Sequence, residues 1–365
     1  MTTRDFGEAG HKLLRQPVRV GLIGCGQWGV NVANAAARCP VLDLCAVADA
    51  DMSRSTSLAA DLGNVPQVVS SADLIADEDV HAVLIVTDAV THYAMAMDAL
   101  DAGKHVFVEK PLALTSTDCV RLALRAHSAG RALMVGHTFM YSDYVESVDR
   151  ALASDELGRV RYMHLQRLAY GRFRSDVNVT WNLGPHDVSI LNHWAGELPE
   201  AVRCVEYAFA RPDLADVAQI TLDFGSFLGH IQLSCVDPQK VRRATVAGTK
   251  AGIVYDDVEG TVALCENGTS STRTLRNAAD NRPLDVEIAH FAECVMTGMT
   301  PKTDGMHAAG VVAVLEAAAI SAANGGAWIR PNMPTSDPWA VQHQPEHAAE
   351  AVTDLCSTSS PESRR

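Results

Sequence analysis

The sequence predicts an α/β protein: a doubly wound parallel sheet, followed by an α+β region with a large, open and mostly antiparallel sheet. Up to about residue 140, short runs of β-forming residues alternate with helical stretches, and these runs are almost continuously apolar. Such runs are typical of parallel strands buried on both faces. After about Tyr141 strands follow one another with few helices between them, and Phe227–Val236 partly alternates, as in an antiparallel sheet.

The first half has the more regular pattern. Gly103 and Gly130 follow two of its expected helices, and glycine commonly ends a helix. Thr115 with Asp118 three residues later resembles a capping box. The expected strands are Val18–Ile23, Val41–Ala48, Gln67–Val69, Ala82–Thr87, His105–Glu109 and Ala132–Gly136. The expected helices are Trp28–Arg38, Met52–Leu62, Ser71–Ala76, His92–Ala102 and Thr115–Ala129.

The second half predicts a separate domain. Its expected strands are Leu157–Tyr170, Ala201–Ala210, Asp216–Phe224, Phe227–Val236, Arg242–Val246 and Thr261–Cys265, and its expected helices are Asp285–Thr297 and Met306–Asn324. We therefore expect a polar arm at 1–16, an α/β domain at 17–140 and an α+β domain at 141–330. The tail at 331–365 is rich in Pro, Ser, Glu and Ala, and its last residues have a disordered composition.

Composition limits the partners and the compartment. The formal net charge of −14 argues against nucleic acid or an anionic membrane as a partner. Nine cysteines without a CxxC pair indicate a reducing compartment, and the polar N-terminus has no signal-peptide core. No run approaches about 18 consecutive apolar residues, the length a membrane span needs. We expect a cytoplasmic protein.

A glycine-rich turn follows the first expected strand. In this turn Gly24 would make the tight bend, Gly26 would let the backbone approach a pyrophosphate, and Gly29 would let the helix pack closely. Gln27 and Trp28 begin the helix, whose free N–H groups favour phosphate. The pattern alone also fits a structural turn, an FAD site or an S-adenosylmethionine site.

A carboxylate ends the second expected strand. Asp49 lies twenty residues after Gly29, where a carboxylate accepts hydrogen bonds from the adenosine ribose and repels a 2′-phosphate. This position favours NAD(H). NADP(H) is not excluded, because Arg54 is close enough in sequence to pair with a 2′-phosphate, and Asp49 also fits a helix-capping or loop carboxylate.

The stretch from Ala102 to Leu112, AGKHVFVEKPL, resembles the signature of the Gfo/Idh/MocA oxidoreductases, the relatives of glucose–fructose oxidoreductase and inositol dehydrogenase. The likeness covers roughly residues 18–330. It implies a Rossmann domain that binds a nicotinamide dinucleotide and a second domain whose sheet often forms the interface of a homodimer or homotetramer. The residues that it assigns to the cofactor are Thr87, His92, Glu109 and Lys110.

Lys110 carries the expected chemistry. It follows a strand at the sheet edge where open α/β folds bind ligands. An ammonium group there can donate a hydrogen bond to a substrate oxygen and stabilise the negative charge that develops during hydride transfer. The alternative is a solvated surface lysine.

A second motif, WNLGPHD at 181–187, matches the family pattern of Asp, three residues, then His. The acid/base histidine falls on His186, but the aspartate position holds Asn182, which orients a hydroxyl without supplying charge. Pro185 predicts the first turn of a helix, and Asp187 would point about 100° away from His186. A buried or capping histidine is the alternative reading.

Other polar residues predict a substrate cleft. Arg172 and Arg174, after Arg167, suit bidentate binding of a diphosphate or a carboxylate, although a solvated, salt-bridged loop fits equally. His137 would line the same cleft. We expect no metal site, because no carboxylate or cysteine completes a set with His186 and His193.

The resemblance implies an NAD(H)-dependent dehydrogenase or ketoreductase that acts on a secondary alcohol of a sugar. The stretch from Arg167 to His186 resembles family members of nucleotide-sugar pathways, which favours a nucleotide-activated sugar as the small-molecule partner. Free inositols or aldoses are the alternative substrates. A non-catalytic regulator that senses the dinucleotide is the alternative from another class.

Overall fold

The computed structural model describes residues 17–63, 67–171, 173–174, 177–269, 271–276 and 282–334. The chain forms two compact units that interleave along the sequence. The first unit comprises the described part of Met1–Glu109 with Arg125–Met134 and Leu284–Asp304, and the second comprises Lys110–Leu124, Val135–Pro283 and the described part of Gly305–Arg365. The expected arm at 1–16 and the tail beyond residue 334 lie outside the described residues.

The first sheet has six strands in the order β3-β2-β1-β4-β5-β6. The pairings β1–β2, β1–β4, β2–β3 and β4–β5 are parallel. The order reverses direction beside β1, the switch point where doubly wound sheets bind their ligands. The strands are β1 (Val18–Ile23), β2 (Leu42–Ala48), β3 (Gln67–Val68), β4 (Ala82–Ile85), β5 (His105–Glu109) and β6 (Leu133–Gly136). The expected doubly wound parallel sheet is confirmed.

Helices connect these parallel strands. They are α1 (Gln27–Arg38), α2 (Met52–Asp61), α3 (Ser71–Ala76), α4 (Ala89–Asp101) and α5 (Ser116–Ala129). The middle strands β4 and β5 are almost wholly buried, as their apolar sequences predict. Helix α8 (Pro283–Thr297), although distant in sequence, belongs to the same unit: Phe291 packs edge-on against Phe107 of β5, with ring centroids 5.9 Å apart.

The second unit is built on an eight-stranded sheet with the order β14-β13-β12-β11-β7-β10-β9-β8. Strands β7 and β10 pair in parallel, and the other pairs are antiparallel. The strands are β7 (Val160–Tyr170), β8 (Ala201–Tyr207), β9 (Val217–Asp223), β10 (Leu228–Ser234), β11 (Val236–Gly248), β12 (Ala251–Asp256), β13 (Thr261–Glu266) and β14 (Thr272–Arg276). The expected open, mostly antiparallel sheet is confirmed.

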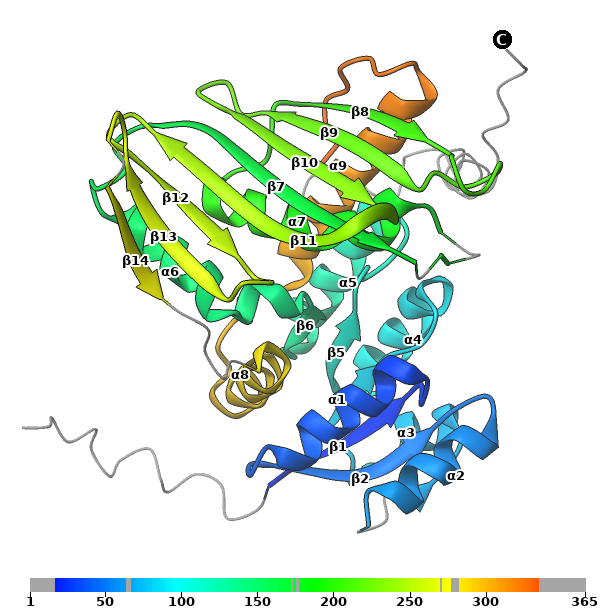
Figure 1. Cartoon of the computed structure of the whole chain (residues 1–365). Helices are drawn as coiled ribbons and strands as arrows, with labels where there is room; N and C mark the ends of the chain where they lie inside the picture. Colours follow the sequence, from blue (N-terminus) through cyan, green and yellow to red (C-terminus); the bar gives the residue numbers. More distant parts are fainter. Residues whose placement is uncertain are drawn as a thin grey trace, which may run out of the picture. The chain divides into compact units, whose positions relative to one another are not determined.

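Helices cover one face of this sheet. Figure 1 shows α6 (Asp143–Ala153), α7 (Val179–Ala195) and α9 (Gly305–Ala323) behind the strands. A short 3₁₀ turn, η1 (Thr138–Tyr141), precedes α6. Burial alternates along β9, β10 and β12, so one set of side chains meets the helices.

Four elements of the second unit were not expected: η1, α6, β12 and β14. Helix α6 is capped by Ser142, whose hydroxyl accepts a hydrogen bond from the Val145 N–H. The helix was missed because its composition is largely polar and its apolar stripe is narrow. Strands β12 and β14 were also missed: β14 is a Thr- and Arg-rich edge strand, whereas β12 is as long as the expected β13. The prediction for Pro185 was wrong: it lies inside α7 rather than in its first turn.

Helix α9 is long and apolar enough to cross a membrane by length and composition alone, and 61% of its apolar window is buried within the chain. Its packing against α7 and β8 accounts for this apolar character, as in a core helix.

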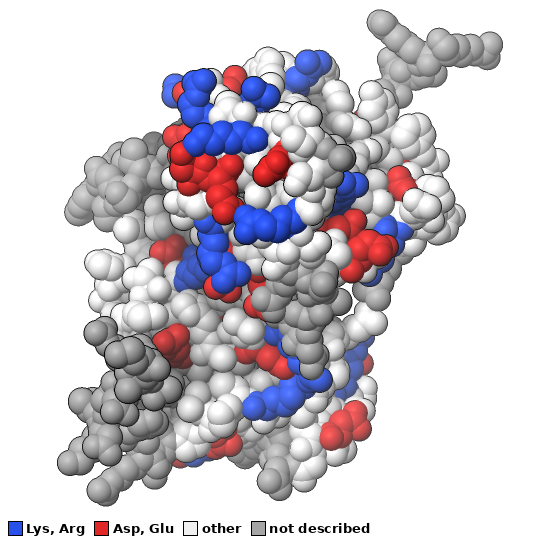
Figure 2. All heavy atoms as spheres, turned by 60° about the vertical axis from the view of Figure 1, so that its left-hand side comes forward, with Lys and Arg blue, Asp and Glu red and all other residues white. Residues whose placement is uncertain are grey.

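On the surface, Lys and Arg lie among Asp and Glu on the face drawn in Figure 2.

Candidate active site

The glycine turn after β1 has the strained geometry that its sequence predicts. Gly24 has φ +101°, and a Cβ atom there would lie 2.4 Å from the Val86 carbonyl oxygen. A Cβ atom on Gly29 would lie 1.9 Å from the carbonyl oxygen of Gly24. Only glycine can occupy either position without moving the backbone.

Gly26, by contrast, faces open space. No atom lies within 4 Å of the position that a Cβ atom would occupy there. Gly26 is also the N-cap residue of α1. Because glycine has no side chain, no side-chain cap accepts hydrogen bonds from the N–H groups of the first turn. An open approach to free N–H groups at the positive end of a helix is the arrangement that binds a pyrophosphate, so the residues present fit a dinucleotide.

Asp49 is held against this turn by the backbone. One carboxylate oxygen accepts the Cys25 N–H at 2.6 Å, and the other accepts the Asp51 N–H at 2.8 Å. The turn is thereby tied to the end of β2, where Gly24 also donates to the Ala48 carbonyl. The loop-bracing role and the ribose-binding role are compatible, because a carboxylate has further acceptor positions.

A cavity of about 270 Å³ lies beside the glycine turn. Its lining comes from the turn, α1 and α2: Cys25, Val30, Ser53, Arg54, Ser57, Leu58 and Asp61. Arg54 is exposed and pairs with Asp51 at 3.4 Å. The cavity lies between α1 and α2, beside the end of β1.

Trp28 links the glycine turn to the end of β5. Its indole Nε1 donates a hydrogen bond of 2.5 Å to Oε1 of Glu109. Glu109 is buried, whereas Trp28 is 43% exposed at the surface of α1. Its neighbour Gln27 is exposed as well. The two sequence motifs, 81 residues apart, therefore meet in the first unit.

Thr87 and His92 brace the loop after β4. The His92 ring is buried, and its Nε2 lies 3.0 Å from the Thr87 carbonyl oxygen. The Thr87 hydroxyl lies 2.7 Å from the Thr91 hydroxyl. Thr87 is half-buried and remains partly accessible, whereas His92 acts through the backbone that it holds.

Lys110 belongs to the second unit, where its ammonium group contacts α7. Lys110 Nζ donates to the backbone carbonyl of Asn182 at 3.1 Å. The N–H that Pro185 lacks would pair with the carbonyl four residues earlier, that of Trp181, so the proline does not account for the Lys110 contact at the Asn182 carbonyl. Asn178 caps the N-terminus of α7: its side-chain oxygen accepts a hydrogen bond of 3.0 Å from the Trp181 N–H.

His186 lies one turn further along α7. Burial, followed by the positive charges of Lys110, Arg167 and nearby Arg242, holds the pKa of His186 well below its ordinary value. Its Nδ1 is buried, and within the described residues it has no hydrogen-bond partner. The ring packs edge-on against Phe139, with centroids 4.9 Å apart. His186 is therefore a neutral imidazole at physiological pH.

His137 is buried beside this group. Both of its ring nitrogens are buried and have no hydrogen-bond partner among the described residues. Burial, then the neighbouring His307 and Lys110, holds its pKa well below the ordinary value. His307 packs edge-on at 5.5 Å, and its Nε2 lies 2.7 Å from the Ser189 hydroxyl.

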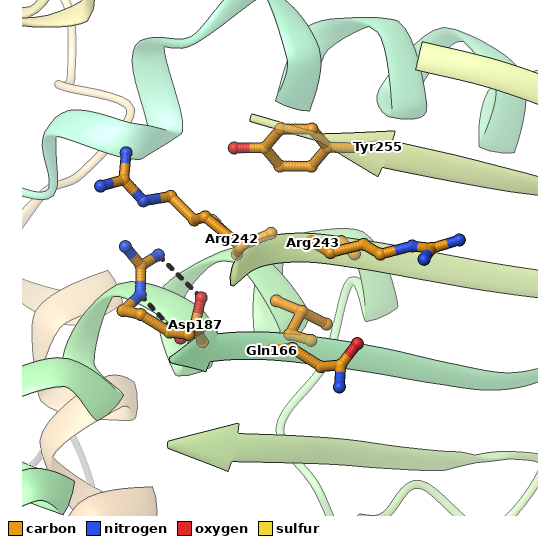
Figure 3. A pocket seen from close by; sticks show the side chains of 9 residues that line it. Gln166, Asp187, Arg242, Arg243 and Tyr255 are labelled. Atoms are coloured by element: carbon orange, nitrogen blue, oxygen red, sulfur yellow. Dashed lines mark hydrogen bonds and ion pairs between the residues drawn. The ribbon is translucent and has the colours of Figure 1, made fainter. Parts of the chain in front are cut away.

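Two arginines approach Phe139, a residue that sequence analysis did not single out. Arg167 Cζ lies 4.4 Å from the centre of the ring and Arg242 Cζ lies 4.8 Å from it. Arg167 is buried and makes a bidentate pair with Asp187 at 2.8 and 2.9 Å. Figure 3 shows Asp187 paired in this way beneath Arg242 and Tyr255. Asp187, which follows His186 in the sequence, is thus ion-paired with Arg167.

The loop predicted to hold substrate is only partly described. Arg172 lies outside the described residues. Arg174 is exposed, and its carbonyl accepts a hydrogen bond from Arg211. Within the described ranges, no group of three or more His, Cys, Asp and Glu side chains is arranged to hold a metal ion.

Sequence analysis missed Phe139, Arg242 and the partner of Asp187. Arg242 begins an expected strand, and a charged residue entering an apolar strand was the available signal. Phe139 had none, because an aromatic residue after a strand is ordinarily read as packing.

Comparison with known proteins agrees with this arrangement. The family model described as "Oxidoreductase family, NAD-binding Rossmann fold" matches residues 18–137, and the "GFO/IDH/MocA C-terminal domain" model matches residues 145–254. Inositol 2-dehydrogenase 1 of Saccharopolyspora erythraea is 35% identical over 152 residues, which are 40% of this chain and 44% of that relative, less than half its length.

Another relative matches over a longer stretch. UDP-N-acetylglucosamine 3-dehydrogenase of Acidithiobacillus ferrooxidans is 29% identical over 72% of this chain and 82% of its own length. Its solved structure superposes with a TM-score of 0.75, at 26% identity over 83% of this chain and 97% of that chain. The structure of GenD2 from gentamicin A biosynthesis, in complex with NAD, gives 0.77 at 25% identity over 91% and 99%. The chain therefore belongs to the Gfo/Idh/MocA family of NAD-binding oxidoreductases.

Proposed function

We propose that this chain is an NAD(H)-dependent dehydrogenase that oxidises a secondary alcohol of a nucleotide-activated sugar, or reduces the corresponding ketone. One observation carries the catalytic part: the Lys110 ammonium group contacts α7 at the Asn182 carbonyl, one turn before a neutral His186. A hydrogen-bond donor and a proton acceptor are thus available to a single hydroxyl group.

The cofactor would be held by the first unit. Gly24, Gly26 and the first turn of α1 would bind the pyrophosphate, and Asp49 would bind the adenosine ribose. Glu109 would bind the nicotinamide ribose, and Lys110 is the next residue of the chain. When bound, the nicotinamide ring accepts or donates a hydride.

The protein residues would then manage the proton. In the oxidation direction Lys110 donates a hydrogen bond to the substrate oxygen and stabilises its developing negative charge. The low pKa of His186 keeps a ring nitrogen unprotonated, so His186 takes the hydroxyl proton while the hydride leaves the same carbon. Asn182 would orient a neighbouring hydroxyl group.

The substrate class rests on two supports. The relative from Acidithiobacillus ferrooxidans acts on UDP-N-acetylglucosamine by its name, and it matches this chain over most of both sequences. The cluster of Lys110, Arg167 and Arg242 around His186 also suits an anionic substrate better than a neutral cyclitol. Inositol is the second candidate, because an inositol 2-dehydrogenase/D-chiro-inositol 3-dehydrogenase matches 76% of this chain at 27% identity.

The test is NADH formation from NAD⁺ with a panel of UDP-sugars, inositols and free aldoses. Lys110→Ala should lower kcat by about 100-fold or more, as loss of an acid/base or oxyanion group does. The same variant should bind NADH within a few-fold of wild type. Full activity of Lys110→Ala would refute the mechanism, and turnover of inositol alone would refute the nucleotide-sugar assignment.

A further inference from the structure

We infer that Arg242 binds an anionic group carried by the sugar substrate and holds it close to the reacting carbon. This inference rests on the proposed function and adds a specificity-determining residue to it. Its basis is the arrangement of two guanidinium groups and one imidazole around a single aromatic ring, all within the second unit.

Phe139 sets the distances. Its ring centre lies 4.9 Å from the His186 ring centre and 4.8 Å from Arg242 Cζ. Arg242 Cζ and the His186 ring centre are therefore at most about 10 Å apart, the sum of these two distances, and the charge of Arg242 is felt at His186. A sugar bound with a hydroxyl at His186 would bring another of its substituents within reach of Arg242.

The two arginines differ in availability. The side chain of Arg167 is 9% exposed, and its Nε and Nη2 both donate to Asp187. The side chain of Arg242 is 28% exposed and, in the part of the chain that the structure describes, it donates from Nη1 to Asp257. A guanidinium has five N–H donors, so Arg242 has donors left for a ligand.

The neighbouring arginine provides a matched control. Figure 3 shows Arg242 and Arg243 extending in opposite directions from β11. Arg243 is exposed and does not approach Phe139. Its loss changes the net charge of the protein by the same amount as loss of Arg242.

The geometry also explains what would select an acidic sugar. The cavity between Arg167, Asp187, Arg242 and Tyr255 measures about 10 Å³, the room of one water molecule. An anionic group cannot enter it and must bind at the accessible side of Arg242. A partly buried guanidinium bound to carboxylate or phosphate forms strong, charge-assisted hydrogen bonds.

The experiment measures binding by calorimetry to the full chain saturated with NADH, so it does not require turnover. The probes are glucose, glucuronate and glucose 1-phosphate. Wild type should bind at least one of the two anions about 10- to 100-fold more tightly than glucose, the effect of a charged hydrogen bond. Preference for glucuronate identifies a carboxylate, and preference for glucose 1-phosphate identifies a phosphate.

Arg242→Gln should remove this preference and leave glucose binding within about twofold. Arg243→Gln should keep the preference. Asp257→Asn should keep or strengthen the preference for the anion, because the substitution frees the Arg242 guanidinium. If the ion pair were merely structural, the Arg242 and Asp257 variants would have the same effect on binding. If Arg242→Gln fails to fold by circular dichroism, Arg242→Gln/Asp257→Asn removes the pair together.

Three results would overturn the assignment: no anion preferred by wild type, equal loss of charged and neutral ligands in Arg242→Gln, or equal effects of the Arg242 and Arg243 variants. Failure of the proposed function looks different. In that case no sugar yields NADH, although an Arg242-dependent preference remains measurable.

Discussion

The Trp28 indole donates its N–H to the Glu109 carboxylate, and this bond joins the dinucleotide turn to the strand that precedes Lys110. The two residues lie in motifs that the sequence presents separately. Because Glu109 is buried and Trp28 belongs to the first turn of α1, the position of the turn and the end of β5 depend on each other. The dinucleotide turn and the end of β5 are therefore coupled within the first unit.

Trp28→Phe tests this coupling. The variant retains an aromatic ring but loses the donor to a buried carboxylate, which should lower the free energy of unfolding by about 1–3 kcal/mol. We expect the Kd for NADH, measured by calorimetry, to rise roughly fivefold or more. An exposed substitution on the same helix, Asn34→Ala, provides the control. An unchanged Kd for Trp28→Phe would mean that the bond does not position the turn.

Two glycines of the turn should respond differently to alanine. Gly29→Ala places a Cβ atom 1.9 Å from a backbone oxygen, so it should lower the melting temperature as well as NADH affinity. Gly26→Ala meets nothing within 4 Å and should fold like wild type. We nevertheless expect Gly26→Ala to weaken NADH binding about tenfold or more, because the methyl group fills the approach to the pyrophosphate. Tight NADH binding by Gly26→Ala would place the phosphates elsewhere.

The architecture was predictable where local patterns decide it. β1 and β5 match their predicted bounds, because continuous apolar runs between polar loops have one interpretation. The second sheet was predicted in outline, but β14 and the full length of β11 were not. Edge and solvated strands depend on pairing with distant residues, as in the Arg243–Asp256 register, which no local window contains.

The candidate site divides in the same way. The glycines, Asp49 and Lys110 could be predicted because each carries a recognisable spacing or motif. The partnership of Arg167 with Asp187 joins β7 to α7 and depends on tertiary packing. The same is true of Arg242 and Phe139, which acquire meaning only from their distances to His186.

His137 should make the protein less stable in acid. Its pKa in the folded state is held well below 6.5, whereas in the unfolded chain it is near 6.5. Below pH 6.5 the unfolded state therefore binds more protons, and the free energy of unfolding falls by up to about 1.4 kcal/mol per pH unit for this group. Above pH 6.5 the contribution is constant.

His137→Phe should remove that contribution. Since neither ring nitrogen has a partner among the described residues, the substitution abandons no hydrogen bond there. Denaturant unfolding should be measured between pH 8 and pH 5. The free energy of unfolding of the variant should rise relative to that of wild type only below about pH 6.5. Exposed His127→Gln should run parallel to wild type. Parallel curves for His137→Phe would show that the histidine is protonated in the native state.

Asn182→Asp places a carboxylate four residues before His186. On α7 that carboxylate would lie one turn from His186 and favour the imidazolium, which raises the pKa of His186. If His186 accepts the proton, the acid limb of the kcat/KM profile should move to higher pH, because the base is protonated sooner. Asn182→Ala removes the amide without adding charge and should leave the limb in place. A limb that stays fixed in Asn182→Asp, while activity is retained, would assign the proton to Lys110 instead.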